Sequence, residues 1–222
     1  MLLPMRLFRL FPLFLMTALA TFAAPAKPLR VAIIFDDGPI PGVTDQLVAL
    51  LGREKVTATL GTVAQKALEH PELTRAAAKA GIEIANHSYS HEHPKPLSDA
   101  KLEEQVVGAQ RHFTETVGVK PVWYWPPFIE LEPRVYAYAQ KAGITVYPFR
   151  KLVASMDYLN TVTAEDIRRH ATTGIEDGTV ILFHEWRKES LEQLPAIIAD
   201  LRRQGCVFMT FSELAAALAA DK

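Results

Sequence analysis

The sequence predicts an α/β fold in which a parallel β-sheet is covered by helices. Strand-like and helix-like segments alternate about seven times between residue 29 and the C-terminus, and such alternation is typical of parallel sheets built from strand–helix–strand units. The strand-like segments are short apolar runs with little in–out alternation, as expected for strands buried on both faces. This pattern leaves open whether the sheet closes into a barrel.

Each predicted strand is a short run rich in β-branched and aromatic residues. The first run ends at Phe35 and is followed at once by two carboxylates, and the run that ends at Phe183 contains no polar residue after its first position. We predict strands over residues 29–35, 56–61, 82–85, 122–125, 144–149, 179–183 and 206–210.

The helices between these strands are recognised mainly by their ends. Pro71 and Gly81 lie at the start and just beyond the end of one helix, positions where proline and glycine are tolerated. Ser98 and Thr163 precede helical segments and are suitable N-caps, Ser98 with Asp99 in the first turn. We predict helices over residues 43–53, 70–80, 98–117, 133–142, 163–172, 190–204 and 211–220.

The first 26 residues have the pattern of an export signal. Arg6 and Arg9 precede an apolar run over 10–20, and small residues follow at 23–26. The apolar run is too short to span a bilayer comfortably. We therefore predict a secretory signal peptide over 1–26, one domain over 27–222, a periplasmic or extracellular location and no stable membrane insertion after cleavage. An uncleaved anchor is the alternative.

Composition excludes some classes of partner. The chain has 24 basic and 25 acidic residues, a formal net charge of −1, so it lacks the basic excess that holds nucleic acid. Its one cysteine, Cys206, cannot form an internal disulfide and stands in an apolar run typical of a buried strand. The sequence does not predict an oligomeric state.

Candidate catalytic and metal-binding residues follow predicted strands. Asp36 and Asp37 end the first strand, and His87 and His91 follow the third; ligands of parallel α/β folds bind at this edge. Residues four apart share one face of a helical turn, so both imidazoles could reach one ion. Two imidazoles and one carboxylate form a common zinc set, which would leave the other carboxylate free as a base. For the aspartates alone, a helix-capping turn is the alternative.

A third histidine follows another predicted strand. His184 comes directly after the run 179–183, which would bring it to the same rim. An imidazole titrates near neutral pH, so we expect a general acid here. His93 lies two residues beyond the histidine pair, and we expect it to be a solvated neighbour.

Four motifs, in this order, resemble those of the polysaccharide deacetylases (carbohydrate esterase family four). The resemblance extends from about residue 29 to the C-terminus. The motifs are Phe35-Asp36-Asp37-Gly38-Pro39, His87-Ser88-Tyr89-Ser90-His91, Pro126-Pro127-Phe128 and Ile181-Leu182-Phe183-His184. The resemblance implies a distorted (β/α) barrel of seven or eight mostly parallel strands and a divalent metal, most often zinc, with cobalt or another divalent ion possible.

The resemblance also implies roles for individual residues. Asp37, His87 and His91 match the metal ligands, Asp36 matches the general base that activates metal-bound water, and His184 matches the acid. The remaining candidates surround the oxyanion and substrate positions. They are Pro127, Phe128 (whose backbone N–H matches the oxyanion donor), Trp125, Tyr124 and Trp186, and the aromatic members could stack on sugar rings.

Two positions depart from the family pattern. Trp125 stands where the family has an arginine that orients the base. In the segment 157–161 only Asp157 matches, because Asn160 replaces the second aspartate, which supports the acid histidine. Both supporting charges are therefore expected to be missing. Glu130, Glu132 and Glu185 are candidates to replace them.

The predicted function is the metal-dependent removal of N-acetyl groups from an amino-sugar polysaccharide or oligosaccharide, such as peptidoglycan, exopolysaccharide or a chitin-like polymer. An O-acetyl esterase acting on a decorated polysaccharide is one alternative. A non-catalytic module that binds glycan or metal is the other, although a base and an acid would be superfluous there.

Overall fold

The protein is built around one parallel β-sheet. The computed structural model describes residues 27–221, and the predicted signal peptide over 1–26 lies outside the described residues. Eight strands are present in the described part of the chain, and all their pairings are parallel. The strands are β1 (Leu29–Gly38), β2 (Thr59–Thr62), β3 (Glu83–Asn86), β4 (Trp123–Tyr124), β5 (Thr145–Val146), β6 (Lys151–Ala154), β7 (Thr179–His184) and β8 (Cys206–Met209).

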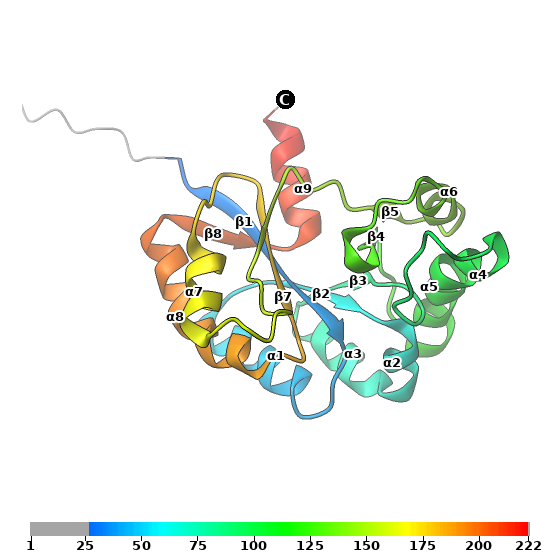
Figure 1. Ribbon diagram of the computed structural model, residues 1–222, viewed down its shortest axis with the longest axis horizontal. Helices are drawn as coiled ribbons and strands as arrows, with labels where there is room; N and C mark the ends of the chain where they lie inside the picture. The colour runs from blue at the N-terminus through cyan, green and yellow to red at the C-terminus, as the bar shows by residue number, and fades with distance from the viewer. Residues whose placement is uncertain (1–26, 222) are drawn as a thin grey trace, which may run out of the picture.

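The sheet follows the path of an incompletely closed barrel. Its order is β5-β4-β3-β2-β1-β7-β6, and within residues 27–221 the end strands β5 and β6 are not paired with each other. β7 occupies one edge of β1 from Val31 to Asp36. β8 pairs with the start of β1 and β2 with its end, so these two strands share the other edge. β1 therefore runs through the middle of the molecule (Figure 1).

Side chains on β1 alternate between two hydrophobic clusters, as expected for a strand buried on both faces. Ile33 and Phe35 belong to the outer cluster, which contains residues of α1, α3, α7 and α8. Ala32 and Ile34 belong to the inner cluster with Trp125. In Figure 1, α1 and α3 lie on one side of β1 and α9 lies on the other. Odd and even positions of the central strand thus face different layers.

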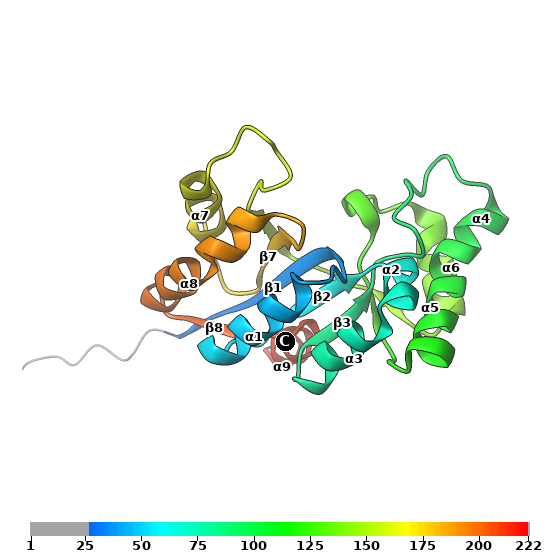
Figure 2. The same cartoon turned by 90° about the horizontal axis from the view of Figure 1, so that it is seen from below.

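The helices surround the sheet, as Figure 2 shows from below. Two π-helical stretches, Glu104–Gly108 and Phe113–Val117, interrupt the predicted helix 98–117. The α-helices are α1 (Thr44–Glu54), α2 (Ala64–Glu69), α3 (Pro71–Lys79), α4 (Asp99–Glu103), α5 (Ala109–His112), α6 (Pro133–Lys141), α7 (Ala164–Thr172), α8 (Lys188–Arg203) and α9 (Phe211–Ala220). Ser98 and Thr163 are N-caps as predicted.

Further segments differ from the sequence prediction. The predicted helix 70–80 is preceded by a separate helix, α2. The break falls at His70, which leaves the helical region (φ −134°, ψ 60°) before Pro71, because proline disfavours a helical conformation at the preceding residue. β6 was not predicted, because its half-buried residues follow Arg150 without a turn signal. β4 and β5 are only two residues long.

No helix within residues 27–221 combines the length and apolar character needed to cross a membrane.

Candidate active site

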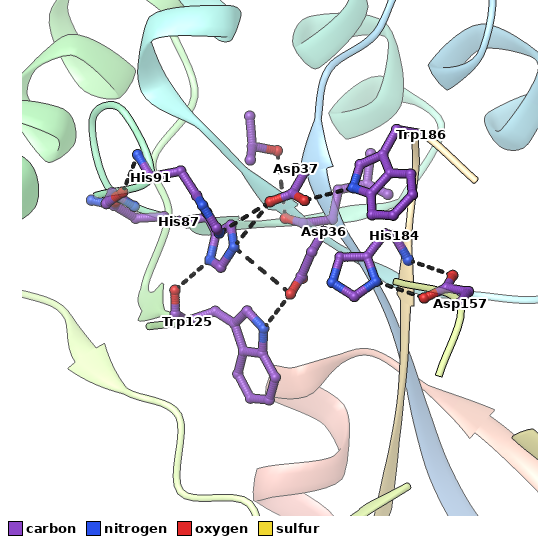
Figure 3. A network of polar contacts seen from close by, with 12 residues as sticks. Asp36, Asp37, His87, His91, Trp125, Asp157, His184 and Trp186 are labelled. Atoms are coloured by element: carbon purple, nitrogen blue, oxygen red, sulfur yellow. Dashed lines mark hydrogen bonds and ion pairs between the residues drawn. The ribbon is translucent and has the colours of Figure 1, made fainter. Parts of the chain in front are cut away.

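Three parallel strands bring Asp36, His87 and His184 to one rim (Figure 3). Asp36 is in register with His184 on β7 and with Gly61 on β2. The period-two alternation along β7 places His184 on the inner face beyond Leu182, which belongs to the inner cluster. The same alternation places Asp36 on the inner face of β1. The predicted meeting of these side chains at the carboxyl edge therefore follows from strand geometry.

Asp36 and Asp37 are adjacent yet serve one rim, because β1 is irregular at this point. Its register with β2 shifts between Asp36 and Gly38, and Asp37 has a left-handed φ of 71°. A Cβ on Gly61 would overlap Asp36 Oδ1, so a larger residue here would displace this carboxylate. The aspartates do not cap α1, whose N-cap is Val43. The helix-capping alternative is therefore wrong.

Asp37, His87 and His91 form a candidate metal centre. Their ligand atoms all lie within 4.8 Å of one another. Asp37 Oδ1 is 3.6 Å from His87 Nε2 and 3.2 Å from His91 Nε2. A tetrahedral zinc ion with bonds of about 2.0–2.1 Å separates its ligand atoms by about 3.3 Å. Asp37 Oδ1 and His87 Nε2 are buried without a hydrogen-bond partner, so the residues present fit a divalent ion.

The two histidines reach this centre from a loop, and the predicted helical turn is wrong. Residues 87–92 contain no helix, and Ser88 and His91 have left-handed φ values of 67° and 60°. The Ser88 hydroxyl accepts a hydrogen bond from the His91 backbone N–H at 2.9 Å. His87 Nδ1–H donates to the Trp125 carbonyl at 2.6 Å, which leaves Nε2 to face the centre.

Buried amides hold this loop, and one of them, Gln105, lies within the π-helical stretch Glu104–Gly108. Gln105 accepts a hydrogen bond from the Ser90 backbone N–H at 3.0 Å and donates to Ser90 Oγ at 2.7 Å and Glu92 Oε1 at 2.9 Å. The residues that it contacts flank His91 on both sides. Asn86 similarly accepts from the Ser88 N–H and donates to Gln110. π-Helical turns are frequent at functional sites, and here one places Gln105 under the loop.

His184 has a charged partner after all. Its Nδ1–H donates to Asp157 Oδ1 at 2.6 Å, and its backbone N–H donates to Asp157 Oδ2 at 2.9 Å. Ser190 Oγ donates to the same carboxylate, whose side chain is fully buried. Asn160 is exposed. The expectation that His184 lost its charge support at Asn160 is therefore wrong, because Asp157 supplies that charge.

Trp125, which the resemblance matches to an arginine of the family, contacts the base candidate Asp36. Its indole Nε1–H donates to Asp36 Oδ2 at 2.9 Å. The three glutamates expected as substitutes lie elsewhere. Glu130 pairs with His93, and Glu132 pairs with Arg134. The Glu185 carboxylate accepts a hydrogen bond from the Thr44 hydroxyl, and Glu185 is hydrogen-bonded to Asp36 only between backbone atoms.

Burial and neighbouring charges set different protonation behaviour for the two aspartates. Burial raises the pKa of Asp36 to about 6, against the opposing pull of His87 and His184. Burial also disfavours ionised Asp37, but His87, His91 and the Trp186 indole lower its pKa well below the ordinary range. Burial would lower the pKa of His87, yet the two carboxylates raise it. The centre is therefore suited to hold positive charge.

A cleft of about 520 Å³ opens onto these groups. A second groove of about 330 Å³ adjoins it, and Asp37, His91 and Trp186 line both. The rest of the cleft wall is largely apolar and includes several residues not singled out in the sequence. The cleft is lined by Asp36, Asp37, His91, Phe128, Ile129, Leu152, Ala154, Tyr158, Leu182, His184 and Trp186.

The predicted rim aromatics divide into two groups. Phe128 and Trp186 are 47% and 42% exposed and line the cleft. Tyr124 and Trp125 are buried to 1% and 0% exposure. Tyr124 packs in the cluster beneath α6, and Trp125 packs against α9. The prediction that a sugar ring could stack on either side chain is therefore wrong. Pro127 is buried behind the rim.

His93 lies outside the candidate metal centre, as expected. It stacks on Phe128, with ring centroids 3.6 Å apart, and its Nδ1 contacts Glu130 at 2.8 Å. Phe128 also contacts His91, with centroids 4.5 Å apart. Phe128 therefore lies between a candidate ligand and a surface histidine.

The site has supporting residues that sequence reasoning missed. Gln105 and Gln110 are polar positions in an otherwise apolar helix stripe, and Asn86 is a polar residue that closes a buried strand. These positions carried a signal, because buried amides need hydrogen-bond partners. The loop contacts themselves could not be inferred from spacing.

Comparisons with known proteins agree with this architecture. Residues 23–147 match the polysaccharide deacetylase family model. A peptidoglycan-N-acetylglucosamine deacetylase of Bacillus cereus is 30% identical over 201 residues, which cover 89% of this chain and 93% of the relative. The chain therefore belongs to the polysaccharide deacetylase family, and the predictions of that family and of an enzyme are confirmed.

Solved structures support the same conclusion. A family 4 carbohydrate esterase from Streptomyces lividans, in complex with acetate, has a TM-score of 0.74 at 30% identity and covers 82% of this chain and 91% of its own. Peptidoglycan deacetylase PdaC from Bacillus subtilis has a TM-score of 0.78 at 25% identity, with 90% and 95% covered. The predicted distorted (β/α) barrel is thus confirmed.

Proposed function

We propose that the protein is a metal-dependent hydrolase that removes N-acetyl groups from an amino-sugar polysaccharide or oligosaccharide. The observation that carries this proposal is the convergence of a carboxylate–imidazole centre, a second carboxylate and a histidine–aspartate pair on one cleft. The Bacillus cereus relative, named as a peptidoglycan-N-acetylglucosamine deacetylase, supports peptidoglycan as the first substrate to test.

Asp37, His87 and His91 would hold the cation, with zinc the first candidate and cobalt another. When bound, a divalent cation acts as a Lewis acid that lowers the pKa of water and polarises the acetyl carbonyl. The His87 Nδ1–H bond to the Trp125 carbonyl fixes the ring so that its Nε2 faces the centre.

Asp36 and His184 would share the proton transfers. Asp36, whose pKa burial raises to about 6, is suited to accept a proton from the attacking water near neutral pH. On the other side of the cleft, burial disfavours protonated His184, but Asp157 raises its pKa. His184 is therefore suited to donate a proton to the departing sugar amine.

The remaining rim residues would bind the substrate. We assign the oxyanion contact to the backbone N–H of Phe128 beside Pro127, because Phe128 has a left-handed φ of 57° and borders the cleft. The exposed faces of Phe128 and Trp186 offer apolar surfaces to sugar rings. A carbohydrate partner accords with this rim, whereas a formal net charge of −1 lacks the overall basic excess that favours binding of nucleic acid.

The proposed location is outside the cytoplasm. Residues 1–26 carry the pattern of a secretory signal, and the catalytic domain would occupy 27–222. Peptide sequencing of the exported protein would test both the cleavage site and the compartment.

Acetate release tests the proposed function. The purified protein, loaded with zinc or cobalt, is incubated with peptidoglycan, chitooligosaccharides and O-acetylated xylan. Release from the N-acetylated glycans is expected. Release from xylan alone would favour the O-acetyl esterase alternative, and no release from any glycan would contradict the proposal.

A further inference from the structure

All three tryptophans of the chain donate a hydrogen bond from the indole N–H. Trp123, which packs against the inner cluster, donates to Ser212 Oγ at 2.8 Å. Trp125 donates to Asp36 Oδ2 at 2.9 Å, and Trp186 donates to Asp37 Oδ2 at 2.8 Å. The second and third therefore end on the two adjacent carboxylates of the site (Figure 3).

Each of these two hydrogen bonds occupies one carboxylate oxygen and leaves the other without a partner. Oδ1 of Asp36 and Oδ1 of Asp37 are both buried and accept no hydrogen bond. For Asp37, the free oxygen is the atom that lies 3.2 Å from His91 Nε2 and 3.6 Å from His87 Nε2. Trp186 therefore leaves one oxygen of Asp37 facing the two imidazoles.

The two indoles lie in different surroundings. Trp125 is fully buried between Phe149 and Phe211, with ring centroids 5.5 and 5.3 Å away, so its position is fixed by packing. Its carbonyl also accepts the His87 Nδ1–H, so one residue orients both Asp36 and His87. Trp186 is 42% exposed at the rim shared by the cleft and the adjoining groove.

We propose that the two tryptophans assign separate roles to the adjacent aspartates. Trp125 is a positioning residue that orients Asp36 as the base, and Trp186 is a positioning residue that presents Asp37 as a one-oxygen metal ligand. The inference rests on the proposed function, in which Asp36 and Asp37 have these roles. An indole N–H donates without adding charge, so both carboxylates keep their negative charge while their rotation is restricted.

Three matched variants test this division: Trp125→Phe, Trp186→Phe and, as the control, Trp123→Phe. We expect Trp125→Phe to lower kcat by about 10–100-fold while the zinc Kd stays within about twofold of wild type. Trp186→Phe should weaken zinc binding by about 10–100-fold and recover much of its kcat at saturating zinc. Trp123→Phe should change neither. Equal losses of kcat and zinc affinity in the first two variants would overturn the division.

A measurement on the metal-free protein does not depend on turnover. The three indole N–H groups give three ¹H–¹⁵N signals, which the three phenylalanine variants assign. Asp36→Asn should shift the Trp125 signal and leave the Trp186 signal in place, and Asp37→Asn should do the reverse. If Asp36→Asn does not move the Trp125 signal, the proposed orientation of Asp36 is wrong.

Trp125 is large and buried, so Trp125→Phe could fail to fold. Site-specific replacement of Trp125 by 3-benzothienylalanine keeps the ring shape and removes only the N–H. The same loss of kcat with retained zinc binding is expected, and an unchanged kcat would overturn the role of Trp125.

Failure of this inference is distinguishable from failure of the proposed function. A wild-type protein that releases no acetate contradicts the proposed function, while the indole signals still report whether each tryptophan holds its own aspartate. An active wild-type protein whose phenylalanine variants match it in kcat and zinc affinity contradicts only the inference.

Discussion

The two sides of the cleft hold their proton-transfer groups by different chemistry. On one side, the His184 imidazole donates a hydrogen bond to a fully buried carboxylate, Asp157. The His184 backbone N–H and the Ser190 hydroxyl donate to the same carboxylate. On the other side, Asp36 is held by the neutral indole of Trp125. The imidazole has a full opposite charge as its partner, whereas the carboxylate has only a dipole.

The difference reflects the charge that each group must carry. A protonated buried imidazole needs a nearby anion, because burial disfavours its charge. Asp36 would receive positive charge from the cation in the adjacent centre, where His87 Nε2 lies 3.7 Å from its carboxylate. A neutral donor that fixes orientation is then sufficient. Each support therefore suits the charge of the group that it holds.

The largest expected effect comes from removing a ligand of the candidate metal centre beside Asp36. His87→Ala removes a ligand and the imidazole next to both aspartates. Loss of a residue that hydrogen-bonds to a metal ligand lowers metal affinity by up to about 100-fold. Loss of the ligand itself should lower zinc affinity by more than this, and acetate release should fall as well. Metal analysis after dialysis measures the zinc content of the variant. Full zinc occupancy in His87→Ala would exclude His87 from the ligand set.

The next largest effect is expected from Asp157→Asn, which removes the charged partner of His184. Burial lowers the pKa of His184, but Asp157 raises it above 6.5, so wild-type activity should persist above that pH. The variant loses the carboxylate, so the alkaline limb of kcat should move to lower pH and kcat should fall by about 10–100-fold. An unchanged limb would show that His184 does not act as the acid.

The same pair makes a pH-dependent contribution to stability. The raised pKa of His184 stabilises the fold below pH 6.5, and this contribution is lost as pH rises through the folded value. The lowered pKa of Asp157 stabilises it above pH 3.8, with loss as pH falls. Wild type and Asp157→Asn should therefore differ most in unfolding free energy between these two values.

A smaller effect is expected beneath the histidine loop. Gln105→Ala removes the amide that holds the residues flanking His91 and leaves a backbone N–H unpaired, so the unfolding free energy should fall by about 1–3 kcal/mol. Zinc affinity should fall by about tenfold. Gln140→Ala, at an exposed position on α6, is the matched control. Equal zinc titrations for the two variants would remove Gln105 from the site.

The smallest effect concerns Asn160. This residue is exposed and Asp157 already holds His184, so Asn160→Asp should change kcat by less than about twofold, as expected for a surface substitution. A gain of tenfold or more would mean that the family's second aspartate is needed here.

Much of the site could be predicted because it follows strand geometry. Apolar runs that end in Asp36 and His184 must deliver these side chains to the same rim when the strands are parallel. The period-two alternation then decides which face they take. Motif order identified Asp37, His87 and His91 as a set, and the structure brings their ligand atoms together.

Other features depend on the directions of loops and side chains, which spacing does not determine. Asp37, Ser88 and His91 have positive φ values, which are uncommon outside glycine. Spacing alone therefore predicts a helical turn for the histidine pair, which is wrong. The indole of Trp125 could have faced a substrate or Asp36, and its packing against Phe211 decides this. The hydrogen bond between Asp157 and His184 likewise depends on side-chain directions that motif spacing does not give.

One paired measurement tests the central claim that adjacent aspartates have separate roles: zinc stoichiometry and acetate release for Asp36→Asn and Asp37→Asn. Asp36→Asn should bind zinc as wild type does and lose about 10²–10⁴-fold in kcat, the usual contribution of a general base. Asp37→Asn should lose zinc. Loss of zinc in Asp36→Asn, or acetate release near the wild-type rate, would contradict the account.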